Sequence, residues 1–281
     1  MQKTLSKYFA VFALPTLIAF VIAFVIPFIM GVYLSFTKFT TVTSVQWVGV
    51  ANYVKAFTAN DEFLNALWFT TKFTIVSIIT INVLGFGLAL LLTRGLKGTN
   101  AFRTAFFTPN LIGGIVLGYI WQVILNGILA LFGVTLTYSP EYGFWGLVIL
   151  MNWQLIGYMM IIYVAGIQNI PGDLIDAARV DGAGKWGVLR NVTIPMVMPA
   201  VTICTFLTLT NSFKLFDQNL ALTAGAPSKQ TAMVALDIFN TFYTRNGWEG
   251  VGQAKAVVFF IVVGALSLIQ LLITRRKEVE Q

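Results

Sequence analysis

The sequence predicts an all-α, polytopic membrane protein with six transmembrane helices. Hydrophobic residues make up 57% of the 281 residues, and the mean hydropathy is +0.81. Only 10% of the residues are charged, whereas a soluble domain carries about 25%. Because this deficit extends along the whole chain, it indicates repeated crossing of a membrane. The net charge of +7 fits basic residues flanking membrane spans, and no dense basic run predicts a nucleic-acid surface.

Six windows are long enough to cross the hydrocarbon core, which takes about 20 apolar residues in a helix. They lie at about 11–36, 69–93, 106–125, 143–167, 194–215 and 256–273. The first window follows Lys3 and Lys7, as a secretory signal would. Its apolar run is too long for a signal, and no clear cleavage site follows it. We therefore expect six retained spans that form one transmembrane domain over residues 1–281.

The distribution of basic residues predicts the orientation. Basic residues are favoured on the cytoplasmic side of short loops. If the N-terminus is inside, the larger group is on the inner side: Lys3, Lys7, Arg94, Lys97, Arg103, Arg179, Lys185, Arg190, Arg275, Arg276 and Lys277. The smaller group is then on the outer side: Lys38, Lys55, Lys72, Lys214, Lys229, Arg245 and Lys255. We therefore expect both termini to be cytoplasmic.

Several familiar kinds of site are excluded by composition. The chain has no histidine and a single cysteine, Cys204, so it lacks the residues for a Cys/His metal centre. Without histidine, the chain also lacks the usual general base of a site that pairs a nucleophile with a base. The P-loop pattern G-x-x-x-x-G-K-[ST] does not occur, so the chain has no P-loop for ATP. We expect no catalytic residue, no metal and no cofactor in this chain.

Polar residues inside the spans mark a candidate substrate path, because such residues usually face a cavity or a partner helix. At about 100° per residue, Thr205, Thr208 and Ser212 fall within about 60° of one another. Hydroxyl, amide and aromatic groups suit a neutral, polyhydroxylated ligand. The alternative is that they bond their own backbone or neighbouring helices. The candidates are Gln122, Asn126, Gln154, Tyr158, Thr205, Thr208, Asn211 and Ser212.

A polar insert, Asp173–Pro199, separates the fourth and fifth spans. Asp173 is a plausible N-cap of a short helix, and Asp176 would lie in its first turn. Gly182 and Gly184 permit a sharp change of direction, and Lys185 begins a second amphipathic turn. The residues alone leave two interpretations open, a solvated hairpin or a docking element for another protein.

The insert resembles the "EAA" motif of permease subunits of binding-protein-dependent ABC importers. That pattern is Glu-Ala-Ala, three residues, Gly, and about eleven residues to a hydrophobe–Pro pair. Here the acid is Asp, one methylene shorter, and the other elements keep their spacing. The resemblance implies a coupling segment over residues 170–192 that docks on a cytoplasmic ATPase. Its residues would be Asp176, Ala177, Ala178, Asp181, Gly182, Ala183 and Lys185, followed by Pro195.

Two outer segments are similar to the carbohydrate branch of these permeases, which includes maltose-, glycerol-phosphate- and multiple-sugar-type importers. They are Trp47-Val48-Gly49 with Asn52-Tyr53 and Phe57, and Gly225-Ala226-Pro227. The resemblance implies the type I ABC importer permease fold, in a subunit like the first-named permease without catalysis of its own. It implies a bacterial or archaeal cytoplasmic membrane, a second homologous permease, two ATPase subunits that hold ATP and Mg, an extracytoplasmic solute-binding protein and a carbohydrate substrate.

The same resemblance assigns some of the path residues. Counted from the insert without gaps, Tyr158, Thr208 and Ser212 match sugar-contacting positions of the maltose-type relatives, whereas Leu155 and Leu215 match others but are apolar. One alternative is a permease for another neutral polar solute, such as a glycerol-phosphate ester. A secondary transporter would need ionisable groups at mid-depth, where Lys214 is the only plausible case. A membrane enzyme without histidine would need paired carboxylates within the membrane, and the sequence has none there.

Overall fold

The computed structural model describes residues 11, 13–41, 44–59 and 62–276, and this part of the chain is mainly helical. Lys3, Lys7 and Lys277, used above to predict the orientation, lie outside the described residues. The chain divides into two compact units. One unit contains Met1–Phe63 and Ile238–Ile261, and the other contains Leu64–Asp237 and Val262–Gln281. Each is described by itself.

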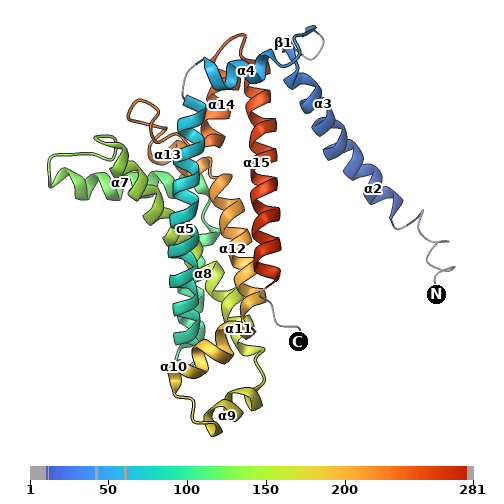
Figure 1. Ribbon diagram of the computed structural model, residues 1–281. Coiled ribbons are helices and arrows are strands. Elements are labelled where there is room, and N and C mark those ends of the chain that lie inside the picture. Colours follow the sequence, from blue (N-terminus) through green and yellow to red (C-terminus); the bar gives the residue numbers. More distant parts are fainter. Residues whose placement is uncertain (1–10, 12, 42–43, 60–61, 277–281) are drawn as a thin grey trace. The chain divides into compact units, whose positions relative to one another are not determined.

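The first unit begins with a long apolar helix and continues into a small hairpin (Figure 1). The helix consists of α2 (Leu14–Phe20), a π-helical segment η1 (Val21–Val25) and α3 (Ile26–Ser35). Strands β1 (Thr37–Thr41) and β2 (Ser44–Trp47) pair antiparallel, with Thr37 opposite Trp47. The unit also contains α4 (Ala51–Thr58), the last residues of α14 (Val234–Thr244) and the first half of α15 (Glu249–Arg275).

Asn52 and Gly250 fix the hairpin to α4 and α15. The Asn52 side-chain amide is buried and donates to the carbonyl oxygens of Ser35 at 2.9 Å and Thr37 at 2.8 Å. A Cβ at Gly250 would lie 2.3 Å from the Thr37 carbonyl oxygen. The close approach of α15 to the start of β1 therefore requires glycine at position 250.

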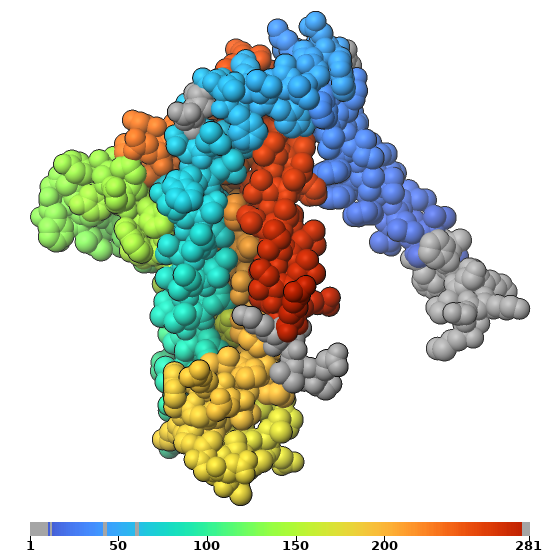
Figure 2. Space-filling model, viewed as in Figure 1, coloured from blue at the N-terminus to red at the C-terminus, as the bar shows by residue number. Residues whose placement is uncertain are grey.

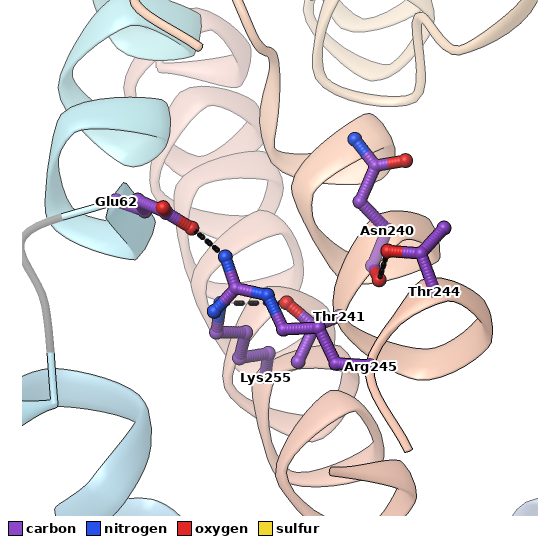
Figure 3. Close-up of polar contacts among 6 residues, drawn as sticks. All are labelled: Glu62, Asn240, Thr241, Thr244, Arg245 and Lys255. Atoms are coloured by element: carbon purple, nitrogen blue, oxygen red, sulfur yellow. Dashed lines mark hydrogen bonds and ion pairs between the residues drawn. The ribbon is translucent and has the colours of Figure 1, made fainter. Parts of the chain in front are cut away.

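Polar contacts in this unit link α14 and α15 to the start of α5 (Glu62–Leu92) (Figure 3). The Arg245 guanidinium forms an ion pair with the Glu62 carboxylate. Lys255 is 1% exposed, its Nζ donates to Thr241 Oγ1 at 2.8 Å, and it lies 5.2 Å from the Phe63 ring centroid. A buried ammonium needs such partners because desolvation of an isolated charge is costly.

The second unit is a helical bundle in which α8 (Pro140–Gln168) is the central helix, with Leu147, Leu150 and Met159 fully buried. At Gly157 a Cβ would lie 1.8 Å from the Phe106 carbonyl oxygen, so glycine allows α6 to pack directly on α8. The unit also contains α5 from Leu64 onward, the start of α14 and the second half of α15. Its other elements are α6 (Thr99–Phe107), the 3₁₀ helix η2 (Thr108–Leu111), α7 (Gly114–Ala130), α9 (Gly172–Val180), α10 (Lys185–Val188), the π-helix η3 (Leu189–Thr193), α11 (Ile194–Met196), α12 (Met198–Phe213) and α13 (Asp217–Leu222).

Within the described residues, four helices are long and apolar enough to cross a membrane: Leu14–Ser35, Glu62–Leu92, Pro140–Gln168 and Glu249–Arg275. Two bent pairs raise the number to as many as six, in agreement with the predicted fold class. These pairs occupy the windows expected at 106–125 and 194–215, which therefore are not single straight helices. The space-filling view shows the same helices with their side chains (Figure 2).

Proline and extended backbone account for both bends. Thr99–Leu111 and Gly114–Ala130 meet at 102°, because η2 contains Pro109 and the residues between the helices are extended. Lys185–Met196 and Met198–Phe213 meet at 66°. Pro199 lies in the first turn of α12 and lacks an N–H, so the hydrogen bond that this residue would donate within the helix is missing beside the bend.

Candidate functional site: the insert and the polar face of the spans

The insert folds into α9, a turn and α10, beyond the ends of α8 and α12 in the second unit (Figure 1). The predicted N-cap at Asp173 is wrong, because α9 begins at Gly172 and its N-cap is Pro171. The Pro171 carbonyl already accepts a hydrogen bond from the Leu174 N–H at 3.2 Å. Asp173 instead lies in the first turn, where a carboxylate is favoured by the helix dipole.

Gly182 ends α9 with a left-handed residue, at φ +85°. The Gly182 N–H donates to the Arg179 carbonyl at 3.0 Å, and the Ala183 N–H donates to the Ala178 carbonyl at 2.9 Å. This pair of bonds is the Schellman motif. The local backbone therefore explains why the EAA-like pattern has glycine at this position. A residue with a Cβ would adopt this positive φ only at a cost in conformational free energy.

The surface of the insert combines small, charged and large apolar side chains. Asp176 and Ala177 are exposed, and Ala178 is half-buried. Asp176 pairs with Arg179 at 3.1 Å, but both side chains are largely exposed, so this pair adds little stability. Val180 is 87% exposed and Trp186 is 72% exposed. The insert thus exposes two large apolar side chains, one at the end of α9 and one in α10, which a partner protein could cover.

The remaining residues of the EAA-like pattern continue from this surface into the span. Asp181 is the C-cap of α9, Lys185 is exposed at the start of α10, and Pro195 lies in α11. The chain runs from α10 through η3 and α11 to the bend before α12. These helical segments follow one another directly and connect the insert to α12.

Two of the predicted path residues, Gln154 and Asn211, line a cavity of about 140 Å³ between α8, α12 and α13. Gln218 Nε2 donates to Gln154 Oε1 at 2.9 Å. Lys214, noted above for its charge, also lines the cavity, together with the apolar Leu155 and Leu215. Gln218 did not emerge from the sequence because it follows the fifth span in α13. The only feature of the sequence that could have indicated Gln218 as a neighbour of Lys214 is their separation of four residues.

Thr208 and Ser212 are completely buried within the second unit. Thr208 Oγ1 donates to the Cys204 carbonyl at 2.7 Å and accepts from Asn82 Nδ2 at 3.4 Å. The Ser212 Oγ atom is buried and has no hydrogen-bond partner among the described residues. Thr205, grouped with them by periodicity, is half-buried. The structure therefore does not bring Thr208 and Ser212 to the cavity.

The other candidates hold neighbouring segments. Gln122 Nε2 donates to the Leu222 carbonyl at 3.1 Å, and Asn126 Oδ1 accepts from the Leu136 N–H at 2.9 Å. Both belong to α7, which bends away from the expected straight span. Tyr158 is half-buried, with its ring centroid 6.4 Å from that of Phe107.

A polar centre that the sequence did not single out joins α5 to α8 and α12. The Tyr163 hydroxyl donates to Asn82 Oδ1 at 2.6 Å, and Asn82 Nδ2 reaches Thr208 at 3.4 Å. The only signal was an asparagine within an apolar window. Hydrogen bonds of this kind hold helices together inside a membrane.

Comparisons with known proteins identify the family predicted from the insert. Residues 81–279 match the family model described as "Binding-protein-dependent transport system inner membrane component". A probable starch degradation products transport system permease protein, AmyD of Thermoanaerobacterium thermosulfurigenes, is 44% identical over 97% of this chain and 96% of its own length. The multiple sugar-binding transport system permease protein MsmF of Streptococcus mutans is 29% identical, over 99% of both chains.

The fold is also that of a solved transporter. A chain in the crystal structure of a bacterial ABC transporter involved in the import of the acidic polysaccharide alginate superimposes with a TM-score of 0.81. The superposition covers 98% of this chain and 98% of the transporter chain, and the two sequences are 20% identical. The predicted type I importer permease fold is thus confirmed. The chain belongs to the family of inner membrane components of binding-protein-dependent transport systems.

Proposed function

We propose that this chain is the transmembrane permease subunit of an ATP-driven, binding-protein-dependent sugar importer, and that it forms one half of the translocation path. The observation that carries the proposal is the exposed surface of α9 and α10, with Val180 and Trp186, on the EAA-like insert. Family membership supports it, because the family is described as the inner membrane component of transport systems that depend on a binding protein.

The energy source lies in other chains. Since the sequence has no P-loop, ATP and Mg would be held by two cytoplasmic ATPase subunits, and this chain would need no cofactor of its own. α9 would sit in a groove of one ATPase, with both termini of the permease in the cytoplasm. A second permease would complete the path. One similar structure is described as an alginate transporter in complex with an oligosaccharide-bound periplasmic protein, which supports an extracytoplasmic binding protein as partner.

The proposed substrate is a carbohydrate. The relatives are named for starch degradation products and for multiple sugars. The amides of Gln154, Asn211 and Gln218 can pair with sugar hydroxyls in the cavity. A second candidate, a glycerol-phosphate ester, is favoured by one observation: the cavity also contains the ammonium group of Lys214.

The coupling role is tested by the ATPase activity of the reconstituted transporter. Sugar-loaded binding protein should stimulate the wild-type assembly. Val180→Asp places a charge in the apolar docking surface and should reduce this stimulation at least about tenfold. Val180→Ala, the matched control, should retain most of it. Full stimulation in the Val180→Asp transporter would refute docking through this surface.

A further inference from the structure

A second cavity, of about 430 Å³, lies between residues 65–72 of α5, residues 140–145 of α8 and Gln230. It belongs to the second unit and shares no lining residue with the small cavity beside α12. Its polar lining consists of Asn65, Lys72, Glu141 and Gln230, and its aromatic lining of Trp68, Phe69, Phe144 and Trp145. Neither the coupling surface nor the proposed path uses this cavity.

The charges in this cavity mark the boundary of the membrane. Lys72 directly precedes residues 73–92 of α5, and Glu141 directly precedes residues 142–168 of α8. Both stretches lack charged side chains and have the length required to cross the hydrocarbon core, about 20 residues. Trp68 and Trp145 are 63% and 54% exposed, as is typical of rings at the level of lipid headgroups.

Apolar strips continue from the cavity along both helices. Exposed Ile75, Ile79 and Val83 follow Lys72 on α5, and exposed Ile149 and Trp153 follow Glu141 and Trp145 on α8. Residues three or four apart share a helix face, so each strip extends from the cavity into the depth of the membrane. A ligand that covers both regions must have a charged head and apolar chains.

We infer that this cavity binds a phospholipid with a zwitterionic headgroup and a primary ammonium, of the phosphatidylethanolamine type. Lys72 would pair with the phosphate, and the Glu141 carboxylate would accept hydrogen bonds from the ammonium. The side-chain oxygens of Asn65 and Gln230 provide further acceptors. One cation and one anion complement a zwitterion better than a purely anionic headgroup, and a trimethylammonium group has no N–H to donate.

Native mass spectrometry of the purified transporter, depleted of lipid, tests the site. It is titrated with phosphatidylethanolamine, phosphatidylcholine and phosphatidylglycerol that carry the same acyl chains. The wild type should bind phosphatidylethanolamine about tenfold more tightly than the other two. Glu141→Gln should lower this affinity to that for phosphatidylcholine. Lys72→Gln should lower the affinities for phosphatidylethanolamine and for phosphatidylcholine about tenfold, because both lipids carry the phosphate with which Lys72 would pair.

The matched controls are Asp173→Asn and Lys38→Gln, which remove the same charges outside the cavity and should leave the lipid preference unchanged. Equal affinity of the wild type for all three lipids would overturn the inference without any variant. Unchanged preference after both substitutions in the cavity would do the same. Competition by soluble glycerophosphoethanolamine or by an oligosaccharide at equal concentration would assign the cavity to a water-soluble solute instead. Loss of sugar transport would leave this lipid preference intact, so the two proposals fail separately.

Discussion

Gly182 is the residue whose backbone conformation closes α9, because its φ of +85° permits the bonds to Arg179 and Ala178. Gly182→Ala should cost about 1–2 kcal/mol, the penalty of a left-handed conformation in a residue with a Cβ. Gly184 has φ −69°, and a Cβ at that position would have no atom within 4 Å. Gly184→Ala should therefore cost less, roughly 0.5 kcal/mol, because Gly184 is the N-cap of α10, where alanine is less favourable than glycine. Thermal unfolding of the purified transporter measures both, and equal melting temperatures for the two variants would contradict this account.

Gln154 and Lys214 distinguish the two candidate substrates, because both line the small cavity. Gln154→Leu removes a hydrogen-bonding group and the partner of Gln218, so uptake of a neutral sugar should fall about tenfold. Lys214→Gln should leave that uptake within about twofold, since a neutral sugar has no charge for the ammonium to pair with. Uptake of radiolabelled sugar by proteoliposomes measures both. A large loss in Lys214→Gln, with normal assembly, would favour an anionic substrate.

The polar path residues illustrate what helical periodicity can predict. The period of a single helix correctly separates its faces, but it does not say which neighbour each face meets. Thr208, a candidate for the path, donates to the Cys204 carbonyl and accepts from Asn82 of α5. Gln154 and Asn211 were expected on different spans, and α13 brings them together with Gln218 around one cavity. The sequence thus predicted the residue types, whereas their environment depends on long-range packing.

At the scale of an element, α15 offers two glycines in contrasting surroundings. A Cβ at Gly250 would lie 2.3 Å from the Thr37 carbonyl oxygen, so Gly250→Ala must displace the hairpin. We expect a loss of about 1–3 kcal/mol in stability. A Cβ at Gly264 would have no atom within 4 Å. Gly264→Ala should be neutral or slightly stabilising, because alanine favours a helix.

Thermal unfolding and limited proteolysis of the two variants measure this difference. Faster cleavage within residues 44–59 of Gly250→Ala, compared with Gly264→Ala, would locate the damage at the hairpin and α4. Equal unfolding temperatures and equal cleavage would show that the hairpin tolerates a Cβ at position 250.

The two bent helix pairs show a feature that mean hydropathy does not predict, namely a local break within an apolar window. The windows at 106–125 and 194–215 are apolar enough for straight spans, and the average over a window does not register a local break. Pro109 and Pro199 were visible in the sequence as breakers, but proline is tolerated in many membrane helices when neighbours satisfy the freed backbone groups. The bends of 102° and 66° depend on those neighbours as well as on the prolines.

For the whole molecule, composition was sufficient to predict the class and the insert was sufficient to predict the family. A charged fraction of 10% over the whole chain leaves few alternatives to a polytopic membrane protein. The residues with the EAA-like spacing form a capped helix followed by a turn. The N-cap of this helix is Pro171, two residues before the predicted Asp173. Contacts between helices, such as Tyr163 with Asn82, could not be derived because they join residues far apart in the sequence.

The orientation is a property of the whole molecule, and the single cysteine makes it accessible to experiment. Cys204 is completely buried, so the wild type should react little with a membrane-impermeant maleimide. Lys38→Cys and Lys229→Cys should react in intact cells, whereas Lys97→Cys and Lys185→Cys should react only after the membrane is opened. The physical reason is the excess of basic residues on the side of Lys97 and Lys185, which favours retention of that side in the cytoplasm. Labelling of Lys185→Cys in intact cells would place the insert outside, where no ATPase could drive it.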